Sequence, residues 1–193
     1  MIQRRWQLFL VFLLFSHSNL TAAAETSHIS LSEALKTQGT VIMFRHALAP
    51  GFGDPSNFRV DDCSTQRNLD SRGQDQSRAI GSQLRALGYA ADAVFSSPWC
   101  RCLETAQLMD VGPVRKSDGL GSFFEGHVDR NQTLKQLSHQ LDAIANAKQQ
   151  PVIMVTHQVV ISAVTGLGTS SGEAILYDPQ TDQSRRVRLN NND

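Results

Sequence analysis

The chain has 193 residues, with 18 Lys or Arg against 18 Asp or Glu, so its formal net charge at pH 7 is zero. Hydrophobic residues make up 40% of the sequence, which is typical of a folded globular domain and not of a disordered chain. A balanced charge gives no indication of the extended basic surface that nucleic-acid and anionic membrane partners require. We therefore expect no nucleic-acid partner.

The N-terminus has the features of an export signal. The basic pair Arg4 and Arg5 precedes the apolar stretch 8–15, and a run of small residues ends at Ala24. We expect cleavage after Ala24 and a periplasmic or secreted protein. A retained anchor is the alternative, but the apolar stretch is shorter than the about 20 residues of a membrane helix. We thus expect a signal peptide at 1–24, no stable membrane insertion after cleavage, and a single mature domain.

The first predicted strand leads directly to two candidate site residues. Ser30 to Glu33 has the form of a capping box and predicts a short helix that ends at Gly39. Residues 40–44 are apolar and β-branched, which predicts a buried strand, and Arg45 and His46 follow it. In open α/β sheets ligands bind at the carboxyl ends of the strands, so these two side chains are candidates for the chemistry.

A long polar loop is expected from residue 47 to 69. Loops of this length are uncommon inside a compact domain and often form lids or binding loops. Arg59 and Arg67 lie in it and are candidates for substrate binding. A helix with an apolar stripe follows, and we expect Ser71 to cap its start and Gly88 to end it.

The next strand–helix unit places another arginine at a helix start. Residues 92–96 predict a strand, and the Ser97-Pro98 pair predicts that a helix begins there. Arg101 would then lie in the first turn, where backbone N–H groups and the helix dipole favour an anion. The alternative is that Arg101 pairs with Glu104 on a solvated face.

The last third of the chain delivers a second histidine. Leucines and an isoleucine at helical spacing predict a long amphipathic helix over 134–144. Residues 151–156 predict a strongly apolar strand that ends in His157, so a second imidazole is expected at the same edge of the sheet as His46. Two segments at 173–177 and 186–189 are typical of a terminal hairpin.

Three cysteines remain to be explained in a chain expected to be exported: Cys63, Cys100 and Cys102. We expect Cys63 to form a disulfide with either Cys100 or Cys102, which point to opposite sides of a helix, and the third to be a free thiol. The alternative is three reduced, buried cysteines. Their spacing does not fit a zinc site.

These motifs together resemble the signature of the histidine phosphatase superfamily, also called phosphoglycerate mutase-like. The resemblance covers residues from about 40 to 165 and includes, in family order, Phe44-Arg45-His46-Ala47, the segment 68–76, Ser96-Ser97-Pro98 with Arg101 and Thr105-Ala106, and Val155-Thr156-His157. It implies a three-layer α/β/α sandwich with a mostly parallel central sheet. Together with the export signal, it implies an exported phosphatase that hydrolyses phosphomonoesters or phosphohistidine, on a small phosphorylated substrate or a phosphoprotein.

The resemblance also implies roles for individual residues. His46 would be the nucleophile that carries a transient phosphohistidine, while Arg45, Arg101 and His157 would surround the phosphoryl oxygens. No metal or other cofactor is then required. Many members place a general-acid Glu where this sequence has Ser122, and Glu125 is the candidate substitute. A solvated loop carboxylate is the alternative role for Glu125, and substrates with good leaving groups would need no strong acid.

Two other classes of protein share parts of this pattern. A binding module that holds phosphate without turnover would keep Arg45, Arg101 and His157 but would not need His46 as a nucleophile. A thiol oxidoreductase would use the Cys100-Arg101-Cys102 stretch, because a neighbouring cation lowers the pKa of a thiol. That stretch lacks the Cys-x-x-Cys spacing of such enzymes, so we favour the phosphatase.

Overall fold

The computed structural model describes residues 28–189, so the expected signal peptide at 1–24 lies outside the described residues. Its centre is one seven-stranded sheet in the order β1-β7-β6-β2-β5-β3-β4. Neighbouring strands pair in parallel except at β7–β6 and β6–β2, which are antiparallel. The strands are β1 His28–Ser30, β2 Val41–Arg45, β3 Val94–Ser96, β4 Val114–Lys116, β5 Val152–Thr156, β6 Ala174–Asp178 and β7 Gln183–Arg188.

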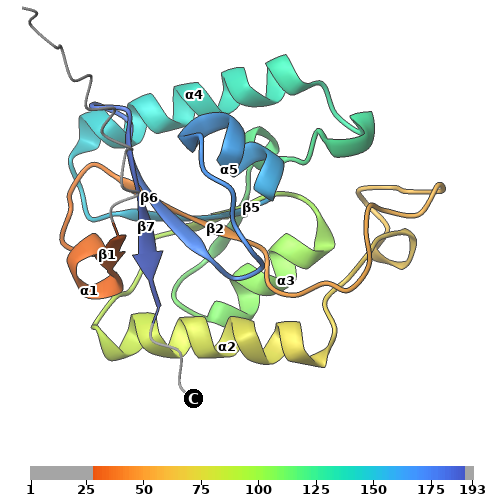
Figure 1. The fold of residues 1–193 in the computed structure, drawn as a ribbon, viewed down its shortest axis with the longest axis horizontal. Helices are drawn as coiled ribbons and strands as arrows, with labels where there is room; N and C mark the ends of the chain where they lie inside the picture. Colours follow the sequence, from red (N-terminus) through yellow and green to blue (C-terminus); the bar gives the residue numbers. More distant parts are fainter. Residues whose placement is uncertain (1–27, 190–193) are drawn as a thin grey trace, which may run out of the picture.

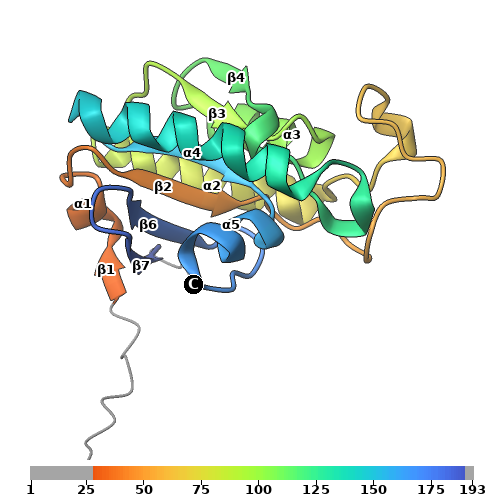
Figure 2. The same cartoon turned by 90° about the horizontal axis from the view of Figure 1, so that it is seen from above.

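Helices cover both faces of this sheet, with α4 and α5 on one side and α2 and α3 on the other (Figure 1). The helices are α1 Leu31–Ala34, α2 Ser71–Ala86, α3 Cys100–Met109, α4 Arg130–Ala147 and α5 Gln158–Thr165, with short 3₁₀ helices at η1 Cys63–Thr65, η2 Asp118–Leu120 and η3 Phe124–Gly126. The three-layer α/β/α architecture with a mostly parallel sheet is therefore confirmed. Viewed from above, α4 and α2 run along opposite faces of the sheet (Figure 2).

Strand β2 shows how the sequence builds the two halves of the core. Ile42 and Phe44 pack with residues of α2 and α3, while Val41 and Met43 pack with residues of α4 and α5. This follows from the alternation of side chains along a strand that is covered on both faces. Each of these side chains is fully buried, which stabilises the fold by about 1.5–3 kcal/mol per residue.

Two helix starts differ from the sequence prediction. Asp70, not Ser71, caps α2, because its side chain accepts a hydrogen bond from the backbone N–H of Gly73. Helix α3 begins at Cys100 and not at Ser97-Pro98. The hydroxyl of Ser97 is hydrogen-bonded to the ring of His157 instead, and the backbone N–H of Cys100 donates to the side chain of Gln66 in the long loop.

The pairing of β2 with β5 brings the two histidines to one edge of the sheet. The strands are parallel, with Arg45 opposite Thr156, and the backbone N–H of His46 donates to the carbonyl of Thr156 at 2.9 Å. His46 and His157 each directly follow the carboxyl end of a central strand. The predicted hairpin is also confirmed as β6 and β7. None of the helices within residues 28–189 is long and apolar enough to cross a membrane.

Candidate active site

A pocket of about 310 Å³ lies where β2 and β5 end. It is lined by Arg45, His46, Gly51, Phe52, Gly53, Asp54, Arg67, Arg101, Ser122, Phe124, His157, Gln158 and Val159. The structure thus brings together five of the residues singled out in the sequence: Arg45, His46, Arg67, Arg101 and His157. Three guanidinium groups share this pocket with one carboxylate, so its charge favours an anion.

His46 is buried and held in one orientation by two contacts. Its Nδ1 lies 2.8 Å from the carbonyl oxygen of Ala47, which assigns the proton to Nδ1. The Nε of Arg101 then donates to the unprotonated Nε2 at 3.3 Å. Burial, and after it the charge of Arg101, lowers the pKa of His46 to about 3, so the ring is neutral at neutral pH with its lone pair on Nε2.

His157 lies beside His46, with ring centroids 5.5 Å apart in an edge-to-face arrangement. The hydroxyl of Ser97 is 2.8 Å from its Nε2 and fixes the orientation of the ring. Nδ1 is then the ring nitrogen available to a bound anion. Burial, and after it the charge of Arg101, lowers the pKa of His157 well below its ordinary value, so this ring is also neutral.

Asp54 is a site residue that the sequence analysis did not identify. Its carboxylate accepts two hydrogen bonds from Arg101, at 2.8 and 3.1 Å, and both side chains are 4% exposed or less. The same carboxylate accepts the backbone N–H of Arg67 and the indole N–H of Trp99. Burial raises the pKa of Asp54, but the bonds from Arg101 and Arg67 outweigh it and hold the pKa below its usual value. Asp54 is therefore ionised and orients Arg101.

The other two arginines approach the pocket from different elements. Arg45, at the end of β2, donates to the carbonyl of Thr169 at 2.7 Å and to the side chain of Gln158 at 3.1 Å. Its buried Nε has no hydrogen-bond partner among residues 28–189. Arg67 reaches the pocket from the long loop and donates to the carbonyls of Ala49 and Gly53. A bound oxyanion would satisfy the free donor of Arg45.

The structure departs from the expected role of Arg59 and from the alternative pairing of Arg101. Arg59 does not line the pocket, because it pairs with Asp61 on the surface, where their side chains are 66% and 67% exposed. The alternative pairing of Arg101 with Glu104 is wrong, since Arg101 is buried against Asp54 and Glu104 accepts a hydrogen bond from Gln74. The long loop therefore contributes Arg67 and Asp54 to the site and not Arg59.

Glu125 lies next to the pocket but does not line it. Its Oε2 accepts a hydrogen bond from the backbone N–H of Asp54 at 3.0 Å and is 3.6 Å from Nε2 of His127. Asp54, Glu125 and His127 place possible metal-ligand atoms within 4.8 Å of one another. The oxygens of Asp54 already accept bonds from Arg101, Arg67 and Trp99, so this group fits an anchor for the loop better than a cation site.

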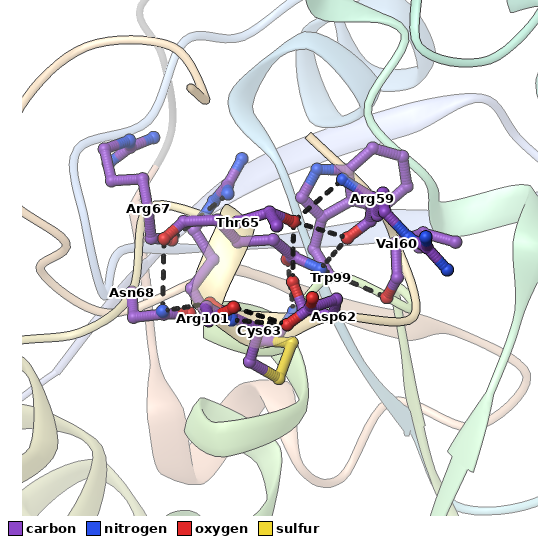
Figure 3. Close-up of a disulfide and its surroundings, with 12 residues drawn as sticks. Arg59, Val60, Asp62, Cys63, Thr65, Arg67, Asn68, Trp99 and Arg101 are labelled. Atoms are coloured by element: carbon purple, nitrogen blue, oxygen red, sulfur yellow. Dashed lines mark hydrogen bonds between the residues drawn. A yellow bond between two sulfur atoms is a disulfide. The ribbon is translucent and has the colours of Figure 1, made fainter. Parts of the chain in front are cut away.

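The disulfide joins Cys63 to Cys100 and leaves Cys102 free and buried. The alternative of three reduced cysteines is therefore wrong. Figure 3 shows the bond between the long loop and the start of α3, next to Arg101. Gln66, on the same loop, accepts the N–H of Cys100 at 2.9 Å. Burial raises the pKa of the Cys102 thiol to about 12, which argues against thiol chemistry at the Cys100-Arg101-Cys102 stretch.

Comparison with known proteins points to one superfamily. A model of the histidine phosphatase superfamily (branch 1) matches residues 41–136, which include Arg45, His46 and Arg101. No curated protein sequence matches the chain. Among solved structures, the protein histidine phosphatase SixA complexed with tungstate is 16% identical, with a TM-score of 0.54 over 76% of this chain and 93% of that chain.

Two further structures have the same fold. A structure from an open reading frame of Mycobacterium tuberculosis is 15% identical, with a TM-score of 0.54 over 78% of this chain and 96% of that one. Phosphoserine phosphatase from Entamoeba histolytica, in complex with 3-phosphoglyceric acid, is 14% identical, with a TM-score of 0.51 over 78% and 96%. At these identities the likeness is one of fold. The family match and the shared fold together support the assignment of this chain to the histidine phosphatase superfamily.

Proposed function

We propose that this protein is a phosphatase that hydrolyses phosphomonoesters or phosphohistidine through a phosphohistidine intermediate on His46. One observation supports this above all others. Nδ1 of His46 is hydrogen-bonded to a backbone carbonyl and therefore carries the proton, so Nε2 has a free lone pair in a pocket that three arginines share. A neutral imidazole is the form that can attack phosphorus. In the free protein that lone pair accepts the Nε–H of Arg101, and a phosphoryl oxygen would replace it as acceptor.

In the first step Nε2 of His46 forms a bond to phosphorus as the bond between phosphorus and the leaving group breaks. The electron pair departs with the leaving atom, which takes its proton from solvent. Arg45, Arg101 and Nδ1 of His157 would bind the phosphoryl oxygens, where negative charge is spread in a loose transition state. Asp54 contributes by holding Arg101 in place.

In the second step a water oxygen attacks the phosphohistidine. The N–P bond breaks, its electron pair returns to Nε2, and a proton of the water passes to solvent. The net reaction consumes one water and releases inorganic phosphate and the dephosphorylated product. The same donors stabilise both transition states because the phosphoryl group stays in the same place.

We further propose that the protein acts outside the cytoplasm. The N-terminal segment with its basic pair and apolar stretch supports export, and the Cys63–Cys100 disulfide is the kind of bond that persists in an oxidising compartment. A fusion to alkaline phosphatase, which is active only after export, tests this. An inactive fusion would contradict export.

The reaction is tested by a screen of phosphomonoesters and a phosphohistidine peptide, with and without chelator. We expect release of inorganic phosphate, and loss of that activity in Arg101→Ala by a few orders of magnitude. A phosphate-binding module without turnover is the competing function. Binding of inorganic phosphate by calorimetry, without hydrolysis of any compound in the panel, would favour that module.

A further inference from the structure

Two phenylalanines lie at the mouth of the pocket, and the proposed chemistry does not use them. Phe52 is 87% exposed and Phe124 is 38% exposed, and their rings meet edge to face with centroids 5.3 Å apart. Both line the pocket that contains His46 and Arg101. The other exposed large hydrophobic residues in the described part of the chain, Val60 and Leu87, do not line it. Single exposed apolar residues are normal, but an aromatic pair at a pocket mouth indicates a ligand contact.

The two rings come from distant parts of the chain that are fastened together. Phe52 lies between Gly51 and Gly53, whose φ angles of 97° and 67° lie in the region that favours glycine. Phe124 precedes Glu125, which has a φ of 64° and binds the N–H of Asp54. A Cβ on Gly53 would come within 2.3 Å of the Glu125 carboxylate. The backbone that carries Phe52 and the backbone that carries Phe124 therefore both contain residues with uncommon positive φ angles, and a hydrogen bond joins the two segments.

We propose that Phe52 and Phe124 form a subsite for an aromatic ring bonded through oxygen to the phosphoryl group, so that the preferred substrates are aryl phosphates. This inference rests on the proposed phosphatase function and specifies its leaving group. The phosphoryl group would lie against the arginines and His46, and the ring against the exposed faces and edges of the two phenylalanines. Aromatic rings prefer such offset or edge-to-face contacts.

The chemistry of the leaving group agrees with this geometry. Asp54, the carboxylate that lines the pocket, is paired with Arg101 and ionised, and Glu125 is bonded to the backbone of the loop. Neither is placed as a proton donor. A phenolic oxygen has a pKa of about 10 and departs readily as phenolate, whereas a more basic alkoxide departs more slowly without a general acid. The P–O bond breaks, the N–P bond to His46 forms, and the phenolate leaves with the electron pair.

The test separates recognition of the ring from the ease of departure. Benzyl and cyclohexylmethyl phosphate have similar alkyl leaving groups, but only the first has an aromatic ring. We expect kcat/KM for benzyl phosphate to be about 3- to 10-fold higher, the range of an aromatic contact. Phe52→Leu, which keeps an apolar side chain at an exposed position, should abolish the difference. Leu87→Ala, a control at an exposed apolar position outside the pocket, should retain it.

Equal values of kcat/KM for the two compounds, or a ratio unchanged in Phe52→Leu, would overturn the aromatic subsite. A preference for decyl phosphate over benzyl phosphate would likewise overturn it, in favour of a lipid phosphate. Free phosphotyrosine and a phosphotyrosine peptide distinguish a small aryl phosphate from a protein as the source of the ring. Failure to hydrolyse any phosphate, p-nitrophenyl phosphate included, would contradict the proposed function itself, which is a different outcome from turnover without aromatic preference.

Discussion

The buried ion pair between Asp54 and Arg101 gives the sharpest prediction about stability. Asp54→Asn removes the negative charge while keeping the shape of the side chain, and it leaves the guanidinium of Arg101 buried without a counter-charge. Breaking one partner of such a pair costs about 3–5 kcal/mol. Both side chains are almost fully buried and the contact is bidentate, at 2.8 and 3.1 Å. We expect a loss near 3 kcal/mol, since the site opens to solvent through the pocket.

The chain offers a matched control for this measurement. Asp61→Asn removes the same charge from a pair with Arg59 that is about two-thirds exposed, where we expect no measurable change in stability. Urea unfolding should be followed by circular dichroism and not by fluorescence. Trp99 donates a hydrogen bond to Asp54, so its fluorescence would respond to the substitution itself as well as to unfolding. Equal unfolding midpoints for Asp54→Asn and Asp61→Asn would refute the reasoning.

The disulfide, the two buried histidines and Glu125 each lead to a testable expectation. Loss of the disulfide in Cys63→Ser should lower the free energy of unfolding, measured in urea, by about 4 kcal/mol, because the loop that the bond closes is long. Digestion of the wild-type protein without reduction should show one alkylatable thiol, and three such thiols would contradict the bond. The free energy of unfolding should fall as the pH drops from 7 to 5, because the lowered pKa of His46 and of His157 keeps both rings neutral in the folded protein while the unfolded chain takes up protons near pH 6.5. His46, with a pKa of about 3, accounts for about 2 kcal/mol of this loss, and His157 adds to it in the same direction. A flat profile from pH 7 to 5 would contradict their burial as neutral groups. Glu125→Gln can still accept the hydrogen bond from the backbone N–H of Asp54, and it should change the rates of hydrolysis of hexyl phosphate and p-nitrophenyl phosphate by the same factor. A selective loss of hexyl phosphate hydrolysis would assign Glu125 as the general acid.

The parts of the fold that follow from local pattern were predictable. The apolar segments that became β2 and β5 are short, uninterrupted and followed by Arg45-His46 and His157, so their place at one sheet edge could be inferred from the sequence. The capping box at Ser30 is also present as expected. These features depend on residues close together in the chain, where periodicity and capping chemistry are informative.

The contacts made by the long loop could not be read in the same way. Asp54 lies in a segment with no periodicity, and its pairing with Arg101 joins residues 47 positions apart. The one available signal was physical: a buried arginine requires a carboxylate, and Asp54 is an acidic residue in a glycine-rich loop close to His46. Likewise, helix phase alone did not distinguish Cys100 from Cys102 as the partner of Cys63, because the path of the loop decides it.

The most direct test of the central claim is to trap the intermediate. The protein is mixed with a hydrolysed phosphomonoester, denatured in alkali within milliseconds, where phosphohistidine survives, and analysed by peptide mass spectrometry. We expect one phosphoryl group, on the peptide that contains His46, and none in His46→Ala. This variant should also be inactive, because no other residue in the pocket offers an unprotonated imidazole Nε2 whose ring is held by a backbone carbonyl and faces Arg101. Wild-type turnover by His46→Ala, or a phosphoryl group on another residue, would contradict the account.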